Sequence, residues 1–433
     1  MLRRKIDQEL IKWHRRTSFK PALLLLGARQ VGKTTSVRTF GRQYYESVIE
    51  MNFEEQPSLK RIFAGDLNIE SIVEKISVAG LGRLVASKTL LFLDEIQSCP
   101  SARTALKFIV EDGRFDVIAS GSLLGLHYRE VSSYPVGFEH KVEMHSLDFE
   151  EFLWANGITD ATIEALKQSY EQRKPVDEYI HQRMMEMFKR YMIVGGMPRV
   201  VSSYVHDKDI GEVLLLQRSI TESYRDDISK YAGKRKGEAK RVFDAIPMQL
   251  TQRNKKFKVS QVEEGGRLRT YEDALEWLHD AGIASFCHNV ANVELPFALN
   301  ARASFFKFFM CDTGLLSSMS MGNAQSAILN DDLSINEGAI VENCIADLLV
   351  KRGYPLFYWD IKGRLEVDFL IQKENTIVPI EVKSGRDYRR HASLDRLMAT
   401  SSRHEKRALV LSPYNVEVAE QIDYLPLYMV MFL

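Results

Sequence analysis

Short apolar runs alternate with helical patterns along the first third of the chain. Residues 22–26 are entirely apolar and precede a glycine, which is typical of a strand buried on both faces of a parallel sheet. Similar runs follow at residues 47–53, 89–94, 115–119 and 142–147. Helical patterns separate them at residues 34–40, 69–79 and 102–110. This alternation predicts a doubly wound α/β domain with a parallel sheet, which we place at residues 1–150.

A helical pattern replaces the strands from Asp148 onward. Apolar residues at helical spacing continue to a breaker cluster at residues 195–198, and the chain then stays mainly helical to residue 330. Within that stretch a short turn, an amphipathic helix and a strand-like run follow one another, at residues 258–261, 271–280 and 305–310. We therefore expect a helical lid followed by a winged-helix-like domain, together spanning residues 151–330.

A polar segment at residues 330–332 marks the next boundary. Beyond it we predict helices at residues 337–351 and 391–400. Strands are predicted at residues 356–360, 366–371, 377–383, 407–411 and 427–431. This order predicts a second, smaller α/β domain at residues 331–433.

The composition agrees with a globular chain of about three domains. The 433 residues include 58 Lys+Arg and 58 Asp+Glu, so the formal net charge is zero. This balance excludes a uniformly basic chain and an acidic disordered one, but it leaves room for local patches. The four cysteines lie far apart without metal-ligand spacing, which is typical of reduced thiols in a cytoplasmic protein. No apolar run approaches the roughly 18 residues of a membrane span, so we expect no membrane association.

The strongest chemical signal is the sequence GARQVGKT at residues 27–34, which follows a predicted strand and opens a predicted helix. Its glycines let backbone N–H groups wrap phosphates, and the helix N-terminus adds partial positive charge. Lys33 is expected to reach the β- and γ-phosphates of ATP, and the Thr34 hydroxyl to ligate Mg²⁺. The expected ATP-binding residues are Gly27, Ala28, Arg29, Gln30, Val31, Gly32, Lys33, Thr34 and Thr35.

A second motif, LLFLDE, ends the predicted strand at residues 89–94 about 55 residues after the phosphate loop. Asp94 is expected to hold Mg²⁺ through water, and Glu95 to polarise the water that attacks the γ-phosphate. A small-molecule kinase has less need of that second carboxylate than a hydrolase has. The pair therefore predicts ATP hydrolysis.

The next strand ends in Ser120, Gly121 and Ser122 and is expected between the strand of the phosphate loop and that of Asp94. Ser120 or Ser122 would sense the γ-phosphate or orient water, and capping of a following helix is an equally good reading. The candidates for an arginine finger are Arg103, Arg114, Arg129 and Arg199, and the sequence does not choose among them.

Five segments together resemble the prokaryotic AAA-type ATP-binding proteins that carry a C-terminal domain of unknown function. They are GARQVGKTT, LLFLDEIQ, IASGSLLG, YPVGFEHKVEMHSLDFEEFL and GGMPRVV. The resemblance covers essentially the whole chain and implies a five-stranded P-loop core, a helical and winged-helix middle, and a restriction-endonuclease-like C-terminal domain. One departure is Phe138, which stands where a basic residue is expected.

Four residues near the C-terminus are similar to the core of PD-(D/E)xK nucleases: Glu342 in a predicted helix, Asp368 in one strand, and Glu381 with Lys383 in the next. Alternation along a strand turns Glu381 and Lys383 to one face. A hairpin turn at residues 373–376 would place Asp368 opposite Glu381, so that both could share one Mg²⁺. Glu342 would be a further metal ligand.

In this reading Lys383 would orient or deprotonate the attacking water, or stabilise the charge that develops on the phosphate. The alternative is a half-exposed strand whose Glu381 and Lys383 are merely solvated. Cleavage activity is a separate hypothesis, because such folds are also kept as binding modules.

Residues 234–270 form a basic segment, with eleven Lys/Arg against four Asp/Glu and a net charge of +7. Such a segment in a winged helix is typical of a contact with the phosphate backbone of DNA or RNA. A solvated helix face or a contact with an acidic partner explains it equally well. Arg267 and Arg269 are expected at the start of a helix, where backbone contacts are often made.

The sequence as a whole predicts an α/β protein that binds ATP and Mg²⁺ and hydrolyses ATP. Hydrolysis is expected to drive a conformational change in a nucleic-acid-binding C-terminal part. One alternative is a nucleotide-gated binding switch with little turnover. Another is a Mg²⁺-dependent nuclease that ATP regulates. The expected partners are ATP and DNA or RNA, and assembly into a homo-oligomer is open.

Overall fold

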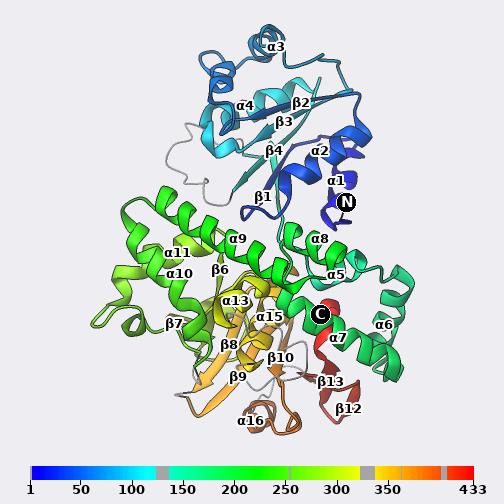
Figure 1. Ribbon diagram of the computed structural model, residues 1–433, viewed down its shortest axis with the longest axis vertical. Helices are drawn as coiled ribbons and strands as arrows, with labels where there is room; N and C mark the ends of the chain where they lie inside the picture. Colours follow the sequence, from blue (N-terminus) through cyan, green and yellow to red (C-terminus); the bar gives the residue numbers. More distant parts are fainter. Residues whose placement is uncertain (1, 123–135, 253–254, 322–336, 362, 401–406) are drawn as a thin grey trace. The chain divides into compact units, whose positions relative to one another are not determined.

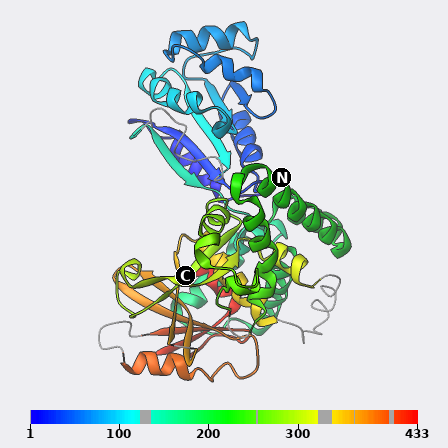
Figure 2. The ribbon, with the colours of Figure 1, turned by 90° about the vertical axis from the view of Figure 1, so that its left-hand side faces the viewer.

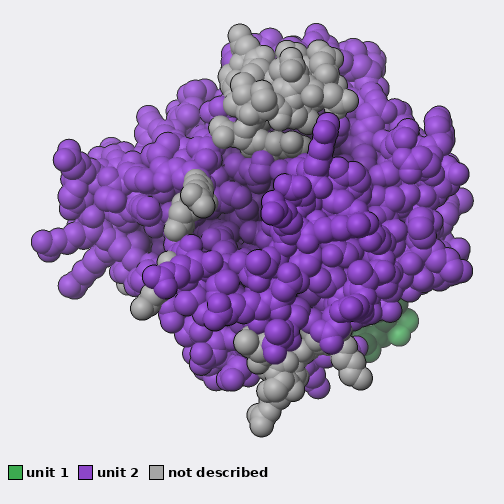
Figure 3. Space-filling model, turned by 90° about the horizontal axis from the view of Figure 1, so that it is seen from below, with its two compact units in different colours: residues 1, 3–146 green, residues 2, 147–433 purple. Residues whose placement is uncertain are grey.

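The computed structural model describes the chain except for residues 1, 123–135, 253–254, 322–336, 362 and 401–406. The chain divides into two compact units, residues 3–146 and residues 147–433, which have different colours in Figure 3. We describe each unit by itself. Of the arginine-finger candidates, Arg129 lies outside the described residues.

The first unit contains a five-stranded parallel sheet with the strand order β2-β3-β4-β1-β5. Its strands are β1 (Ala22–Gly27), β2 (Ser47–Asn52), β3 (Thr89–Asp94), β4 (Asp116–Ser122) and β5 (Glu139–Glu143). Its helices are α1 (Ile6–His14), α2 (Lys33–Tyr44), α3 (Ile69–Val78) and α4 (Pro100–Asp112), with the 3₁₀ turns η1 (Pro57–Phe63) and η2 (Ile96–Ser98). Strand β4 lies between β1 and β3, as predicted.

Helices cover both faces of this sheet (Figure 1). The side chains of β1 alternate between the two layers, because successive residues of a strand point to opposite faces. Leu24 and Leu26 belong to the core that includes α3 and α4, whereas Leu23 and Leu25 belong to the core that includes α1 and α2. All six residues of β1 are buried, which explains the continuous apolar run in the sequence.

The predicted position of the fifth strand was wrong by three residues, since β5 runs from Glu139 to Glu143 rather than over residues 142–147. Strand β5 is a half-exposed edge strand, so its sequence EHKVE does not read as an apolar run. The apolar residues that follow β5 are buried in the core although they do not belong to a strand. Met144 joins the core beside α2, and Leu147 is fully buried at the start of the second unit.

The second unit begins with helices. They are α5 (Phe149–Ala155), α6 (Asp160–Gln172), α7 (Glu178–Val194), α8 (Pro198–Asp207), α9 (Ile210–Tyr231), α10 (Lys236–Leu250) and α11 (Leu268–Asp280), with the 3₁₀ turns η4 (Gly233–Arg235) and η5 (Val259–Gln261). Further along are α12 (Phe297–Asn300), α13 (Thr313–Met321), α15 (Glu337–Lys351), α16 (Ala392–Thr400) and the 3₁₀ helix η6 (Leu427–Phe432). The predicted helices at residues 271–280, 337–351 and 391–400 are thus confirmed.

An eight-stranded mixed sheet joins the middle and the C-terminal parts of this unit (Figure 2). In spatial order its strands are β12 (Glu417–Ala419), β13 (Ile422–Pro426), β11 (Ala408–Ser412), β10 (Thr376–Val382), β9 (Leu365–Lys373), β8 (Leu356–Ile361), β6 (Ala284–Val290) and β7 (Ala301–Met310). The sheet therefore holds strands from both sides of residue 330. The winged-helix and restriction-endonuclease-like descriptions, and the three-part division of the chain, stay predictions.

The hairpin of β9 and β10 has the predicted register, with Ile377 opposite Gln372. The predicted strand at residues 427–431 was wrong, because these residues form η6 and the last strand is β13 just before it. Leu427, Met429 and their neighbours in η6 are buried. A short apolar run buried on all sides has no period that separates strand from helix.

Candidate functional site

The phosphate loop lies where β1 ends and α2 begins. A side chain at Gly27 would place its Cβ 2.1 Å from the backbone oxygen of Met144, so only glycine fits there. Gly32 caps α2 with a φ of 97°, a left-handed conformation that favours glycine. The first N–H groups of α2 have no helical partner and carry partial positive charge, which makes this end of the helix suited to an anion.

The ammonium group of Lys33 is held by the loop itself. Its Nζ donates hydrogen bonds to the backbone oxygens of Gly27 at 2.9 Å and Ala28 at 2.8 Å. Burial lowers the pKa of Lys33 to about 8, while the nearby carboxylates of Glu95 and Asp94 act in the opposite direction. The group therefore stays mostly protonated at neutral pH, as a phosphate ligand requires.

The Asp94 carboxylate is the centre of a hydrogen-bond network at the end of β3. It accepts hydrogen bonds from the Thr34 hydroxyl at 2.9 Å and from the Asn52 amide at 3.2 Å. The Ser120 hydroxyl also donates to it, and Ser122 lies opposite Gly27 in the adjoining pair of strands. The structure thus brings together Thr34 and Asp94, the two expected ligands of Mg²⁺.

Glu95 follows directly and has a left-handed backbone with a φ of 53°. This conformation is uncommon for a residue other than glycine and is often found at functional sites. Burial raises the pKa of the Glu95 carboxyl, although a hydrogen bond from Gln97 partly offsets that effect. A Cβ on Gly121 would lie 2.7 Å from the Gln97 side-chain oxygen, so this glycine leaves room for the partner of Glu95.

Asn52 and Gln97 are the site residues that sequence reasoning missed. Asn52 ends β2 and lies opposite Asp94 in the parallel pair of β2 and β3. The carboxyl ends of parallel strands lie at one edge of a sheet, so a polar residue ending a predicted strand was the available signal. Gln97, two residues after Glu95, has no such signal.

The remaining predicted ATP-binding residues have different surroundings in the loop. Arg29 forms an ion pair with Glu54 at 3.1 Å, and Gln30 has a φ of 66°. Val31 is buried in the core. Thr35 is exposed on the first turn of α2.

Two arginine-finger candidates are occupied within the first unit. Arg103 is buried and pairs with Glu139 at 2.9 Å. Arg114 pairs with Asp112 and Glu70, each at 2.9 Å. Arg103 in particular is therefore held in place as part of the core rather than exposed to a neighbouring subunit.

The C-terminal carboxylates converge around a buried lysine that sequence reasoning missed. Lys307 of β7 is fully buried and donates to the Glu342 carboxylate at 2.9 Å. It also pairs with Glu366 at 2.6 Å, and Lys255 forms a second ion pair with Glu342. No spacing in the sequence links Lys307 to α15, because only the packing of β7 against that helix brings them together.

The two predicted strands contribute as expected from their register. Asp368 accepts a hydrogen bond from the backbone N–H of Val382 at 2.8 Å, and Lys383 pairs with Glu381 at 2.8 Å. Burial and the neighbouring Glu381 and Glu342 raise the pKa of Asp368. Burial also acts to raise the pKa of Glu342, but Lys255 and Lys307 outweigh it and lower that pKa to about 2.

The two sites differ in how well their residues fit Mg²⁺. Thr34 and Asp94 offer one hydroxyl and one carboxylate beside a phosphate cradle, which is the usual protein contribution to a Mg²⁺–nucleotide site. In the C-terminal cluster the Lys307 and Lys255 ammonium groups already neutralise Glu342. In the described part of the chain, no three Asp, Glu, His or Cys residues are arranged to hold a metal ion. Binding of Mg²⁺ by Glu342, Asp368 and Glu381 stays a prediction.

The basic segment at residues 234–270 is partly engaged in ion pairs. Three of its side chains contact carboxylates outside the segment: Lys255 with Glu342, Lys256 with Asp360, and Arg235 with Asp273. Arg267 caps α11 and Arg269 lies in its first turn, as predicted. The net charge counted from the sequence thus overstates the positive charge available to a polyanion.

Family comparisons match three separate stretches of the chain. Residues 19–153 match the model of an AAA domain. Residues 185–326 and 337–430 match two models described as domains of unknown function, DUF8612 and DUF4143. Residues 19–153 thus resemble an AAA-type ATPase domain, a class in which ATP binding and hydrolysis are expected.

Similar proteins add little beyond this class. The chain is 22% identical over 362 residues to the uncharacterized protein MJ1544 of Methanocaldococcus jannaschii. The aligned region covers 81% of this chain and 72% of that protein. The Thermotoga maritima RuvB Holliday junction branch migration motor is 14% identical with a TM-score of 0.31, over 66% of this chain and 89% of that one.

The Aeropyrum pernix ORC1 protein in complex with DNA is 14% identical with a TM-score of 0.29, over 77% of this chain and 93% of that one. TM-scores this low do not establish a shared fold for the whole chain. Among the described helices, none combines the length and the apolar character that crossing a membrane would take.

Proposed function

We propose that the first unit binds ATP with Mg²⁺ and hydrolyses it, and that hydrolysis rearranges the second unit. The observation that carries the proposal is the convergence of Lys33, Thr34, Asp94 and Glu95 at one edge of the parallel sheet. A P-loop without the two carboxylates would support binding alone. With them, the site has both a phosphate cradle and a base for water.

The residues of this chain have distinct roles in that reaction. The N–H groups at the start of α2 and the Lys33 ammonium would bind the β- and γ-phosphates, with Lys33 exchanging loop carbonyls for phosphate oxygens. Bound Mg²⁺ neutralises charge on the phosphates. Glu95 would accept a hydrogen bond from the attacking water and take its proton, a role that its raised pKa favours.

The start of the second unit supports a coupling role. The backbone oxygen of Leu147 accepts hydrogen bonds from the Tyr191 hydroxyl at 2.8 Å and from Lys351 at 3.2 Å, and its N–H donates to Gly196 at 2.7 Å. Leu147 is thus fixed to α7, to α15 and to the glycine pair before α8. The chain reaches it directly from β5, the neighbour of β1 in the ATPase sheet. A displacement of β5 would therefore be transmitted along the chain to Leu147 and to its three hydrogen-bond partners.

The test is steady-state ATP turnover by the wild type, Lys33→Ala and Glu95→Gln, each with and without Mg²⁺. We expect turnover in the wild type and a loss of about 100-fold or more in both variants, with ATP still bound by Glu95→Gln. Undiminished turnover in Glu95→Gln would refute its role as the base. Absence of Mg²⁺-dependent turnover in the wild type would refute the proposal as a whole.

A nucleotide-gated switch with slow turnover is the second candidate. It is favoured by the ion pairs that hold Arg103 and Arg114, two of the four arginine-finger candidates, within their own unit. Loss of an arginine finger slows hydrolysis by about 10³–10⁵-fold in related chemistry. Two results together would support it: slow hydrolysis in a single-turnover assay, and protection of the chain from proteolysis when nucleotide is bound, before that nucleotide is hydrolysed. The same turnover assay with added DNA or RNA tests the proposed nucleic-acid partner, because backbone binding must show salt-dependent stimulation.

A further inference from the structure

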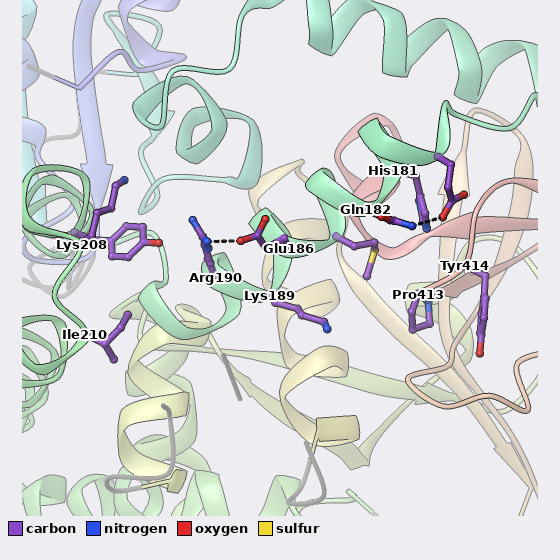
Figure 4. A pocket seen from close by; sticks show the side chains of 12 residues that line it. His181, Gln182, Glu186, Lys189, Arg190, Lys208, Ile210, Pro413 and Tyr414 are labelled. Carbon is purple, nitrogen blue, oxygen red and sulfur yellow. Dashed lines mark hydrogen bonds and ion pairs between the residues drawn. The ribbon is translucent and has the colours of Figure 1, made fainter. Parts of the chain in front are cut away.

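A cavity of about 1000 Å³ lies along α7 inside the second unit (Figure 4). One face of α7 lines it from Glu178 to Arg190, and the rest of the lining comes from α8, from the start of α9 and from the residues that follow β11. At a rise of about 1.5 Å per residue, the stretch of α7 from Glu178 to Arg190 is about 18 Å long. An extended chain of about five residues has this length.

The segment after β11 closes the cavity where α7 begins. Two hydrogen bonds join the Asn415 side chain to the backbone of Val176, just before α7, at 2.9 Å and 2.7 Å. Pro413 and Tyr414, which line the cavity, are thereby held at this end (Figure 4). Tyr414 is 39% exposed, and its ring stacks on Tyr388 with the ring centres 4.5 Å apart. This end therefore offers a fixed apolar surface.

Positive side chains gather toward the other end of the cavity. Lys189 and Arg190 come from α7, and Lys208 comes from the C-cap of α8. The Lys208 backbone N–H donates to the Tyr204 oxygen at 2.9 Å, and its ammonium group lies 4.6 Å from the centre of the Tyr204 ring. Burial lowers the pKa of Lys208, and the positive charges of Arg190 and Arg183 lower it further. An anion near Lys208 would relieve that repulsion.

Two carboxylates also line the cavity, and they lie in different surroundings. Glu186 forms ion pairs with Arg183 at 2.6 Å and with Arg190, so its charge is matched within α7 itself. Glu178 lies in the first turn of α7, toward the end with Tyr414, and accepts a hydrogen bond from Gln182 at 2.9 Å. The cavity is therefore negative where α7 begins and positive farther along the helix.

This distribution of charge fits a segment of protein better than a nucleic acid. A nucleic acid carries a negative charge at every phosphate, so a strand along the whole cavity would meet Glu178 as well as the lysines. A peptide can place carboxylates at one end and an apolar side chain at the other. The apolar surface of Pro413 and Tyr414 suits such a side chain.

We propose that this cavity is a docking site for an acidic segment of a partner protein, bound in extended conformation along α7. Two neighbouring carboxylates of the segment would pair with Arg190 and Lys208, with Lys189 beside them. Arg190 can donate N–H groups in a fixed fork, and Lys208 adds a point charge. An aromatic or apolar side chain about five residues away would rest on Pro413 and Tyr414. The site lies wholly within the second unit and does not depend on the proposed ATP hydrolysis.

The experiment is selection from a random peptide library displayed on phage, with the immobilised full chain as the target. Enriched peptides are then synthesised with a fluorescent label and titrated by fluorescence anisotropy. We expect them to carry two neighbouring acidic residues and, about five residues away, an aromatic or apolar one. Arg190→Gln with Lys208→Gln should weaken their binding about tenfold or more. Tyr414→Ala should weaken it as well, and so should replacement of the peptide's acidic residues by their amides.

The matched control is Lys167→Gln, which removes an exposed lysine of α6 outside the cavity and should leave the affinity unchanged. Lys208 is itself exposed, so Lys208→Gln alone should fold as the wild type does and weaken binding in the same direction. The proposal is overturned if the enriched peptides are not acidic, or if they bind the variant with Arg190→Gln and Lys208→Gln as tightly as the wild type. Displacement of the peptide by an equal concentration of single-stranded oligonucleotide would also overturn it, in favour of a nucleic acid.

Discussion

Replacing Lys307 with methionine should destabilise the second unit strongly and in a pH-dependent way. Lys307 is fully buried, and its ammonium group contacts the carboxylates of Glu342 and Glu366. Methionine fills a similar volume but leaves Glu342, which is only 3% exposed, with a single remaining cationic partner in Lys255. Breaking a buried ion pair in this way is costly because the remaining charge stays out of water.

The magnitude follows from the pKa of Glu342. Its depression from the ordinary value of 4.5 to about 2 corresponds to about 3 kcal/mol of favourable interaction with the two lysines, after the penalty of burial. Lys307 supplies a large part of that interaction from inside the core. We therefore expect Lys307→Met to lower the free energy of unfolding by about 2–4 kcal/mol at pH 7.

The sign of the pH dependence is also determined. Because the Glu342 pKa is depressed in the folded chain, its stabilisation is present above pH 4.5 and is lost as the pH falls from there through about 2. In Lys307→Met the same carboxylate can take up a proton more easily. The difference between variant and wild type should therefore shrink as the pH is lowered from 7 toward 3.

The assay is urea unfolding followed by tryptophan fluorescence, which reports mainly on the second unit because Trp154, Trp277 and Trp359 lie there. Lys167→Met is the control, since an exposed lysine in an ion pair contributes only about 0–1 kcal/mol. A loss below about 1 kcal/mol in Lys307→Met, or a loss that is the same at pH 7 and pH 3, would contradict the buried-charge argument.

Three further predictions concern single residues. In Gly196→Ala the new Cβ would lie 2.0 Å from a backbone oxygen, so the melting temperature should fall by several degrees, whereas Gly237→Ala meets nothing within 4 Å and should not lower it. Asn52→Leu removes a hydrogen bond to Asp94 and should raise the Mg²⁺ concentration for half-maximal ATP turnover about tenfold, while an unchanged requirement would exclude this role. Turnover at saturating ATP should rise with pH through a midpoint above 4.5, because Glu95 acts deprotonated and its pKa is raised; a midpoint at or below 4.5 would contradict this.

The phosphate-loop site could be placed from the sequence because its signals are local. The phosphate loop is eight contiguous residues between a strand and a helix, and the geometry of that turn follows from the residues themselves. Asp94 and Ser120 could also be placed, since parallel strands end at one edge of a sheet. Asn52 ends such a strand too, but the sequence contains no motif that distinguishes it from ordinary polar residues at strand ends.

The C-terminal cluster shows where this reasoning stops. The register of one hairpin correctly placed Asp368 and Glu381 on adjacent strands, because a tight turn links them. The sequence said nothing of Lys307, which lies 35 residues before Glu342 and reaches it through the packing of β7 against α15. That contact places an ion pair on Glu342, which we predicted as a metal ligand.

The sequence by itself determined the P-loop, the order of strands and helices around it, and the class of reaction that its carboxylates suit. These depend on neighbours in the chain and on the fixed periods of strands and helices. Only the tertiary structure decided which charges are neutralised, that strands from both sides of residue 330 share one sheet, and that a charged cavity exists beside α7. Each of those depends on residues far apart in the chain, whose contacts arise from packing and carry no spacing that a sequence pattern can reveal.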